Sequence, residues 1–286
     1  MTAPFAHVIG DPIAQSKSPL IHGFWLEKLA QNATYSSHRV QGDARAVKDY
    51  IAAARQNPAW LGCNVTMPHK QSMAGALDRL DPVAARIGAV NTVVREDEEL
   101  VGYNTDADGF LEPLRDELAQ QHLFRMARII GTGGAARAIV VALADRGFTL
   151  VLAGRNPDKA RAILGELAPD GDHHAVHLNR FSDPTDFPFD DREGCLDLVV
   201  NASPLGMRGS PALAFDWSHA PPGSIAYDII TDPIETPFLS DAKAAGFATI
   251  GGLSMLLGQA ATAFEKFFGK APPREFDDLL REQLRA

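Results

Sequence analysis

The stretch Ile129-Ile130-Gly131-Thr132-Gly133-Gly134-Ala135-Ala136 decides the fold class, because it joins the end of an apolar strand pattern to the start of a helical one. In such a strand-turn-helix unit, the spacing G-x-G-x-x-A is typical of a dinucleotide site. The first glycine allows a tight turn and the second lets the backbone approach a pyrophosphate, which then lies at the helix N-terminus. The sequence therefore predicts a dinucleotide site at Gly131, Gly133, Gly134 and Ala135.

The end of the following strand indicates which dinucleotide is bound. An NAD site usually has Asp or Glu there for the ribose 2'-hydroxyl, but this chain has Gly154-Arg155-Asn156. A guanidinium group suits the 2'-phosphate of NADP, and Lys159 adds a second cation. NADP is therefore favoured over NAD. The alternative that Arg155 and Lys159 are solvated residues at a helix start stays open, because Asp158 lies between them.

Strand and helix patterns alternate on both sides of this stretch, which predicts crossover units and mostly parallel sheets. Before it, we expect strands at residues 5–10, 34–40, 60–66, 89–94 and 100–103, and helices at 19–31, 44–55, 82–87 and 108–120. From it onward, we expect strands at residues 127–130, 149–153, 196–201, 224–230 and 248–250, and helices at 135–146, 157–167 and 253–268. A tail with Pro272-Pro273 and alternating charges is expected to end the chain.

Composition excludes several classes of protein. The chain has 286 residues, 45% hydrophobic and 22% charged, as expected for a globular protein of two domains or one large α/β domain. Its 27 basic and 36 acidic residues give a net charge of -9, which argues against nucleic-acid binding. Cys63 and Cys195 suggest neither a disulfide framework nor a thiolate metal site, and a reducing cytoplasm fits them best. No apolar run reaches the roughly 18 residues of a membrane span, so we expect no membrane partner.

Polar clusters follow the expected strand ends of the N-terminal half, and taken singly each is ordinary capping or turn chemistry. They are Ser16-Lys17-Ser18-Pro19, Asn64-Val65-Thr66-Met67-Pro68-His69-Lys70, Gly88-Ala89-Val90-Asn91-Thr92 and Gly102-Tyr103-Asn104-Thr105-Asp106. With the segments 131–137, 201–207 and 252–259, their order and spacing resemble the shikimate dehydrogenase family over nearly the whole chain. The resemblance implies NADP-dependent, reversible reduction of 3-dehydroshikimate to shikimate, a step of chorismate and aromatic amino-acid biosynthesis.

The expected fold is α/β with two domains. Residues 1–105 plus 251–286 would form the substrate domain, with a mostly parallel sheet, and residues 106–250 a Rossmann-type NADP-binding domain. We expect a cleft at the junction, with hinges near Gly109 and Gly251. The sequence leaves a monomer and a homodimer equally open.

The resemblance also assigns site residues. Lys70 and Asp106 would carry the proton transfer, since reducing a ketone needs a proton donor at the developing alkoxide. The residues implied to contact the substrate are Ser16, Ser18, Asn64, Thr66, Asn91 and Gln259. Those implied to contact the cofactor are Gly131, Gly133, Gly134, Ala135, Arg155, Asn156, Lys159, Met207 and Gly252. No metal is needed, and His173-His174-x-x-His177 is interpreted as a solvated surface loop.

Two other functions remain open at this stage. One is a quinate or dual quinate and shikimate dehydrogenase, for which NAD as the cofactor also stays open. Thr231 stands where the family usually has tyrosine, which leaves substrate preference undecided. The other is a non-catalytic nucleotide sensor, against which the presence of both Lys70 and Asp106 argues. Which of these two residues is the formal base also stays open, because a coupled pair titrates as a unit.

Overall fold

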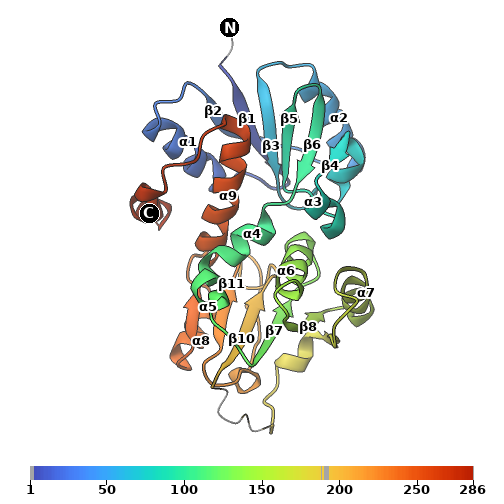
Figure 1. Ribbon diagram of the computed structural model, residues 1–286, viewed down its shortest axis with the longest axis vertical. Helices are drawn as coiled ribbons and strands as arrows, with labels where there is room; N and C mark the ends of the chain where they lie inside the picture. The colour runs from blue at the N-terminus through green and yellow to red at the C-terminus, as the bar shows by residue number, and fades with distance from the viewer. Residues whose placement is uncertain (1–2, 188, 190–192, 286) are drawn as a thin grey trace. The chain divides into compact units, whose positions relative to one another are not determined.

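The computed structural model describes residues 3–187, 189 and 193–285, and its backbone contacts divide the chain into two compact units (Figure 1). The first unit comprises Met1–Asp106 with Leu257–Ala286, and the second comprises Ala107–Leu256. The chain thus leaves the first unit after Asp106 and returns to it at Leu257, inside the helix Gly252–Phe268. This return is six residues later than the expected boundary at Gly251. Each unit is built around its own six-stranded sheet.

The sheet of the first unit has the strand order β2-β1-β3-β5-β6-β4. Its strands are β1 (Phe5–Gly10), β2 (Thr34–Arg39), β3 (Trp60–Val65), β4 (Arg79–Leu80), β5 (Thr92–Glu96) and β6 (Glu99–Tyr103). Neighbouring strands are parallel except where β5 pairs with β3 and β6. The expectation of a mostly parallel sheet is confirmed. The carboxyl ends of β3 and β6, where parallel sheets carry their sites, therefore lie at the same edge.

Helices cover both faces of this sheet, with α1 and α9 on one face and α2 on the other (Figure 1). The helices of the unit are α1 (Ser18–Lys28), α2 (Ala44–Arg55), α3 (Pro82–Ile87), α9 (Gly252–Phe268) and α10 (Asp277–Arg285). Helix α9 lies close to β3 because Gly62 has no side chain; a Cβ there would be 2.7 Å from the ring of Phe267. On the α2 face, Val47 and Ile51 pack with Trp60 in a buried cluster.

The sheet of the second unit is entirely parallel, with the strand order β12-β11-β10-β7-β8-β9. Its strands are β7 (Phe124–Ile130), β8 (Thr149–Gly154), β9 (His174–His177), β10 (Cys195–Asn201), β11 (Ile225–Asp228) and β12 (Ala248–Ile250). Its helices include α4 (Asp106–Leu111), α5 (Arg115–Ala119), α6 (Gly134–Ala144), α7 (Pro157–Leu167) and α8 (Pro237–Ala244). This is the doubly wound order of dinucleotide-binding folds, and the chain reverses direction across the sheet between β7 and β10.

Three local expectations were wrong. The helix expected at residues 108–120 is interrupted by a 3-10 turn at Glu112–Leu114, because Pro113 cannot donate a helical hydrogen bond. The histidine segment is not a solvated loop: it forms the edge strand β9, and His173 Nδ1 accepts a hydrogen bond from Leu150 N at 3.0 Å. The C-terminal tail ends in the amphipathic helix α10, whose Leu280 and Leu284 are buried.

No helix in the described part of the chain is long and apolar enough to cross a membrane.

Candidate active site

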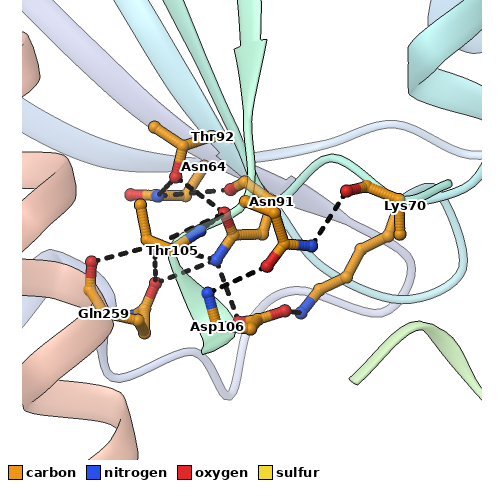
Figure 2. A network of polar contacts seen from close by, with 9 residues as sticks. Asn64, Lys70, Asn91, Thr92, Thr105, Asp106 and Gln259 are labelled. Carbon is orange, nitrogen blue, oxygen red and sulfur yellow. Dashed lines mark hydrogen bonds and ion pairs between the residues drawn. The ribbon is translucent and has the colours of Figure 1, made fainter. Parts of the chain in front are cut away.

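An ion pair between Lys70 and Asp106 lies at the edge where β3 and β6 end. Lys70 follows β3 in a turn, and Asp106 begins α4 just after β6. Lys70 Nζ donates to Asp106 Oδ2 at 2.6 Å, and the side chains are only 17% and 5% exposed (Figure 2). Because water screens such a sheltered pair less than a surface pair, the carboxylate of Asp106 holds the ammonium group of Lys70 in place.

Asn91 connects this ion pair to the neighbouring elements (Figure 2). Its Nδ2 donates to Asp106 Oδ1 and to Thr105 Oγ1, both at 2.9 Å, and lies 3.5 Å from Gln259 Oε1. Thr105 Oγ1 also donates to the carbonyl of Gln259 at 3.1 Å. Gln259 of α9 therefore joins the same network, although it lies 154 positions after Thr105 in the sequence.

Asn64 extends the network along β3. Its Nδ2 donates to Thr92 Oγ1 at 3.0 Å and to the carbonyl of Asn91 at 3.3 Å, while its Oδ1 accepts from Tyr35 at 2.6 Å. Both amide hydrogens of Asn64 thus have protein partners, and its remaining capacity is as an acceptor. In addition to Asn64, this network contains four of the predicted site residues: Lys70, Asn91, Asp106 and Gln259.

The predicted serines lie at the start of α1. Ser16 Oγ accepts from Ser18 N at 3.3 Å, which places both hydroxyl groups in one turn. Ser18 also interacts with Tyr35, where it partly opposes the rise in the pKa of the phenol that burial causes. Thr66 follows β3. Its methyl group packs against Gly10, the last residue of β1, so closely that a Cβ on Gly10 would lie 2.5 Å from it. All three predicted hydroxyl residues therefore follow the carboxyl ends of β1 and β3.

The glycine-rich turn of the second unit has the conformation expected from its sequence. Gly131 has φ +127°, and a Cβ there would lie 2.5 Å from the carbonyl oxygen of Ala202. Gly133, by contrast, faces open space, with nothing within 4 Å of an added Cβ. Helix α6 begins at Gly134 with no side-chain hydrogen bond at its cap. Its first N–H groups are therefore placed as anion-binding helix termini require.

The predicted cationic residues follow β8, the next strand in the sheet. Arg155 and Lys159 are exposed, and Asn156 Oδ1 caps α7 by accepting from Asp158 N and Lys159 N at 2.9 and 3.2 Å. The carboxyl ends of β7 and β8 lie at one edge because the strands are parallel. The cations and the glycine-rich turn therefore share that edge.

A buried carboxyl group organises the loop that contains Met207. Asp228 accepts from Asn201 Nδ2 at 3.2 Å and from Thr236 Oγ1 at 2.6 Å. Burial raises the pKa of Asp228, and these donors partly oppose the rise. Asn201 holds the following turn by accepting from Ser203 Oγ at 2.7 Å and donating to the carbonyl of Leu205.

Gly252, the last predicted cofactor residue, is required by packing, because a Cβ there would be 2.3 Å from the carbonyl oxygen of Ile230.

Sequence reasoning missed three residues of these networks. Thr105 lies inside a quoted cluster but was given no role, although threonine beside Asn and Asp in a turn is a signal for polar contacts. Asp228 ends an otherwise apolar strand, and a carboxylate in such a run is itself a signal of a buried network. Tyr35 carries no such signal, since tyrosine is common in strands.

Comparisons with known proteins agree with this arrangement. Residues 8–93 match the family model for the shikimate dehydrogenase substrate binding domain, and residues 252–276 match that for the shikimate 5'-dehydrogenase C-terminal domain. The chain is 45% identical to shikimate dehydrogenase (NADP(+)) of Sphingopyxis alaskensis, over 99% of this chain and 97% of that protein.

Solved structures are similar over the same length. The shikimate 5-dehydrogenase of Thermus thermophilus in complex with NADP(H) and shikimate has a TM-score of 0.78 and 32% identity, covering 99% of this chain and 100% of that one. Quinate dehydrogenase of Corynebacterium glutamicum in complex with NAD has a TM-score of 0.82 and 28% identity, covering 98% and 99% of the two chains. The expected α/β fold, with a substrate unit and a Rossmann-type unit, is thereby confirmed.

Proposed function

This chain belongs to the shikimate dehydrogenase family, and we propose that it catalyses the reversible, NADP-linked reduction of 3-dehydroshikimate to shikimate. The observation that carries the proposal is the sheltered pair of Lys70 and Asp106, 2.6 Å apart, together with the Asn91 amide that donates to Asp106 and suits a polyhydroxylated ring. A quinate dehydrogenase is the alternative that the experiment below distinguishes.

Lys70 and Asp106 supply the proton chemistry in this proposal. A ketone that receives hydride develops negative charge on its oxygen, and an ammonium group beside it both stabilises that charge and donates the proton. Asp106 holds the ammonium group in place through its Oδ2. In the oxidative direction the proton returns from the substrate hydroxyl group to the same site.

The remaining polar residues of the first unit bind and orient the substrate. Asn91 and Gln259 present amide groups next to Asp106, where ring hydroxyls would be held. Ser16 and Ser18 lie in one turn and would donate their hydroxyl hydrogens to the substrate carboxylate. Correct placement of the carbonyl beside a proton donor accounts for much of the rate that such a site gains.

The second unit fits NADP. Its open Gly133, the uncapped N-terminus of α6 and the exposed Arg155 and Lys159 are placed as a pyrophosphate and a 2'-phosphate would require. When bound, the nicotinamide group supplies or accepts the hydride. We therefore assign substrate binding to the first unit and dinucleotide binding to the second.

Initial rates with shikimate and quinate, each with NADP and with NAD, test the proposal. We expect the highest kcat/KM for shikimate with NADP. A Lys70→Ala preparation purified in the same way controls for a dehydrogenase carried over from the expression host, and it should be almost inactive. No oxidation of shikimate with either cofactor would refute the function, and a higher kcat/KM for quinate would replace the substrate.

A further inference from the structure

A chain of buried hydrogen bonds leads away from the Lys70 and Asp106 pair and ends at Tyr35 on β2. Tyr35 is only 8% exposed, and its ring stacks on His22 with centroids 4.0 Å apart and planes 4° from parallel. Its hydroxyl group donates to Asn64 Oδ1 at 2.6 Å, and Ser18 partly opposes the rise in the pKa of the same phenol that burial causes. The phenol therefore occupies one fixed position between the serine turn and the amide network.

A backbone contact identifies which way the Asn91 amide points. Thr105 N can only donate, and it lies 2.8 Å from one end of the Asn91 amide, which must therefore be the oxygen. The other end, the Nδ2 group, then faces Asp106 Oδ1 at 2.9 Å. In the opposite orientation two acceptors would face each other at that distance, which is repulsive.

The same logic fixes every other group in the chain. Thr92 Oγ1 donates to Asn91 Oδ1 at 3.0 Å, so it accepts from Asn64 Nδ2, also at 3.0 Å (Figure 2). Asn64 Oδ1 then faces Tyr35, whose phenol must donate. Burial raises the pKa of Tyr35 well above its usual value, so the phenol keeps its hydrogen. Donation thus runs in one direction, from Tyr35 through Asn64, Thr92 and Asn91 to Asp106.

We propose that Tyr35 and Thr92 are positioning residues, which hold the amides of Asn64 and Asn91 in one orientation so that Asn91 donates to Asp106. The inference rests on the proposed function for its catalytic meaning, but the hydrogen-bond chain itself belongs to the free protein. Removing a group that holds a catalytic residue in position often lowers activity about 10-fold.

Thr92 is the most direct place to cut the chain. Thr92→Val keeps the shape but removes both the donor to Asn91 and the acceptor for Asn64, and we expect kcat/KM to fall about 10-fold. Thr92→Ser restores the hydroxyl group and should retain activity within about twofold of the unmodified protein, as expected when only the hydroxyl matters. Tyr35→Phe removes the far end of the chain and should give a smaller loss in the same direction.

The pH profile separates positioning from a general loss of structure. Asn91 donates to Asp106, so loosening it should change the shape of the pH profile of kcat/KM, whereas a loss of folded protein would lower kcat/KM by the same factor at every pH. Tyr50→Phe is the matched control: Tyr50 is a largely buried tyrosine of the same unit, but its hydroxyl contacts His7 and Trp60. Its profile should coincide with that of the unmodified protein.

A double-variant cycle tests the connection itself. If Tyr35 acts through Thr92, the Tyr35→Phe/Thr92→Val protein should lose little more activity than Thr92→Val alone, whereas independent roles would multiply. Losses that multiply, pH profiles of unchanged shape, or equal losses in Tyr50→Phe and Tyr35→Phe would each overturn the proposal. Chemical unfolding of the same variants without substrate gives a second reading of the coupling. If the unmodified protein fails to oxidise shikimate, the proposed function is refuted. The unfolding data then decide on the hydrogen-bond chain alone: non-additive losses of stability in the double variant support it, and additive losses overturn it.

Discussion

Replacing His22 by phenylalanine should make the protein more resistant to acid. His22 is completely buried on α1, in an aromatic cluster with Tyr35 and Phe264, and neither ring nitrogen has a hydrogen-bond partner in the described structure. Burial alone lowers its pKa to about 3. Phenylalanine has a similar shape, can keep the stacking on Tyr35 and cannot be protonated.

The size of the effect follows from the difference in pKa between the folded and unfolded states. Between pH 6.5 and 3, an unfolded chain binds a proton at His22 that the folded chain does not bind, so the free energy of unfolding falls as the pH falls. At pH 5 this costs roughly 2 kcal/mol, and the full cost below pH 3 is about 5 kcal/mol, at about 1.4 kcal/mol per pKa unit. Above pH 7.5 the contribution of this group to pH dependence vanishes.

Urea unfolding at pH 7.5 and pH 5 measures this quantity. The difference in unfolding free energy between His22→Phe and the unmodified protein should shift by roughly 2 kcal/mol in favour of the variant at the lower pH. Other histidines are present in both proteins and cancel in this comparison. Phe264→Leu, which alters packing in the same cluster without a titrating group, should change stability equally at both pH values. Parallel pH dependences for His22→Phe and the unmodified protein would refute the reasoning.

Three further substitutions test the two units. Lys70→Ala should lower kcat about 100-fold or more and change KM for shikimate much less, as expected for a transition-state proton donor; unimpaired turnover would refute its assignment. Arg155→Ala should raise KM for NADP and leave that for NAD nearly unchanged, since NAD lacks the 2'-phosphate; equal effects on both cofactors would mean that Arg155 does not bind the phosphate. Gly131→Ala should lower the free energy of unfolding by about 1–3 kcal/mol, because its φ of +127° and the carbonyl of Ala202 exclude a Cβ, while Gly133→Ala, which faces open space, serves as the control in the same unfolding assay.

Strand and helix periodicity predicted most of the fold because its elements are regular and strongly patterned. The helix Ala44–Arg55 has the predicted bounds, with Asp43 capping it by accepting from Arg45 N. Two of the edge strands, β4 and β9, were missed, since β4 has two residues and β9 has only Ala175 and Val176 between two exposed histidines. Helix α10 was missed because only Leu280 and Leu284 mark its buried face among charged residues.

The candidate site was predicted as a set of residues rather than as an arrangement. Motif spacing placed Lys70 and Asp106 after strands whose carboxyl ends lie at one edge, and Asn91 lies at that edge because it precedes the antiparallel strand β5. Gln259 could be included only by resemblance, because nothing in the sequence of a helix so far along the chain indicates which sheet it packs against. Tyr35 was overlooked for the same reason: its role depends on the pairing of β2 with β1, which places it next to the serine turn and Asn64.

The orientation of the amides is the part of the chemistry that only the fold can specify. An asparagine in a motif has an oxygen and a nitrogen at nearly equivalent positions, and the sequence does not say which one faces a carboxylate. Here Asn91 N donates to the carbonyl of Tyr103 at 3.0 Å, which aligns the end of β6 with Asn91 and brings Thr105 N against the Asn91 side chain. That backbone donor and the Thr92 hydroxyl group together hold the oxygen of Asn91 on their side and leave Nδ2 for Asp106. The pairing of β5 with β6 thus contributes to which end of the Asn91 amide faces Asp106.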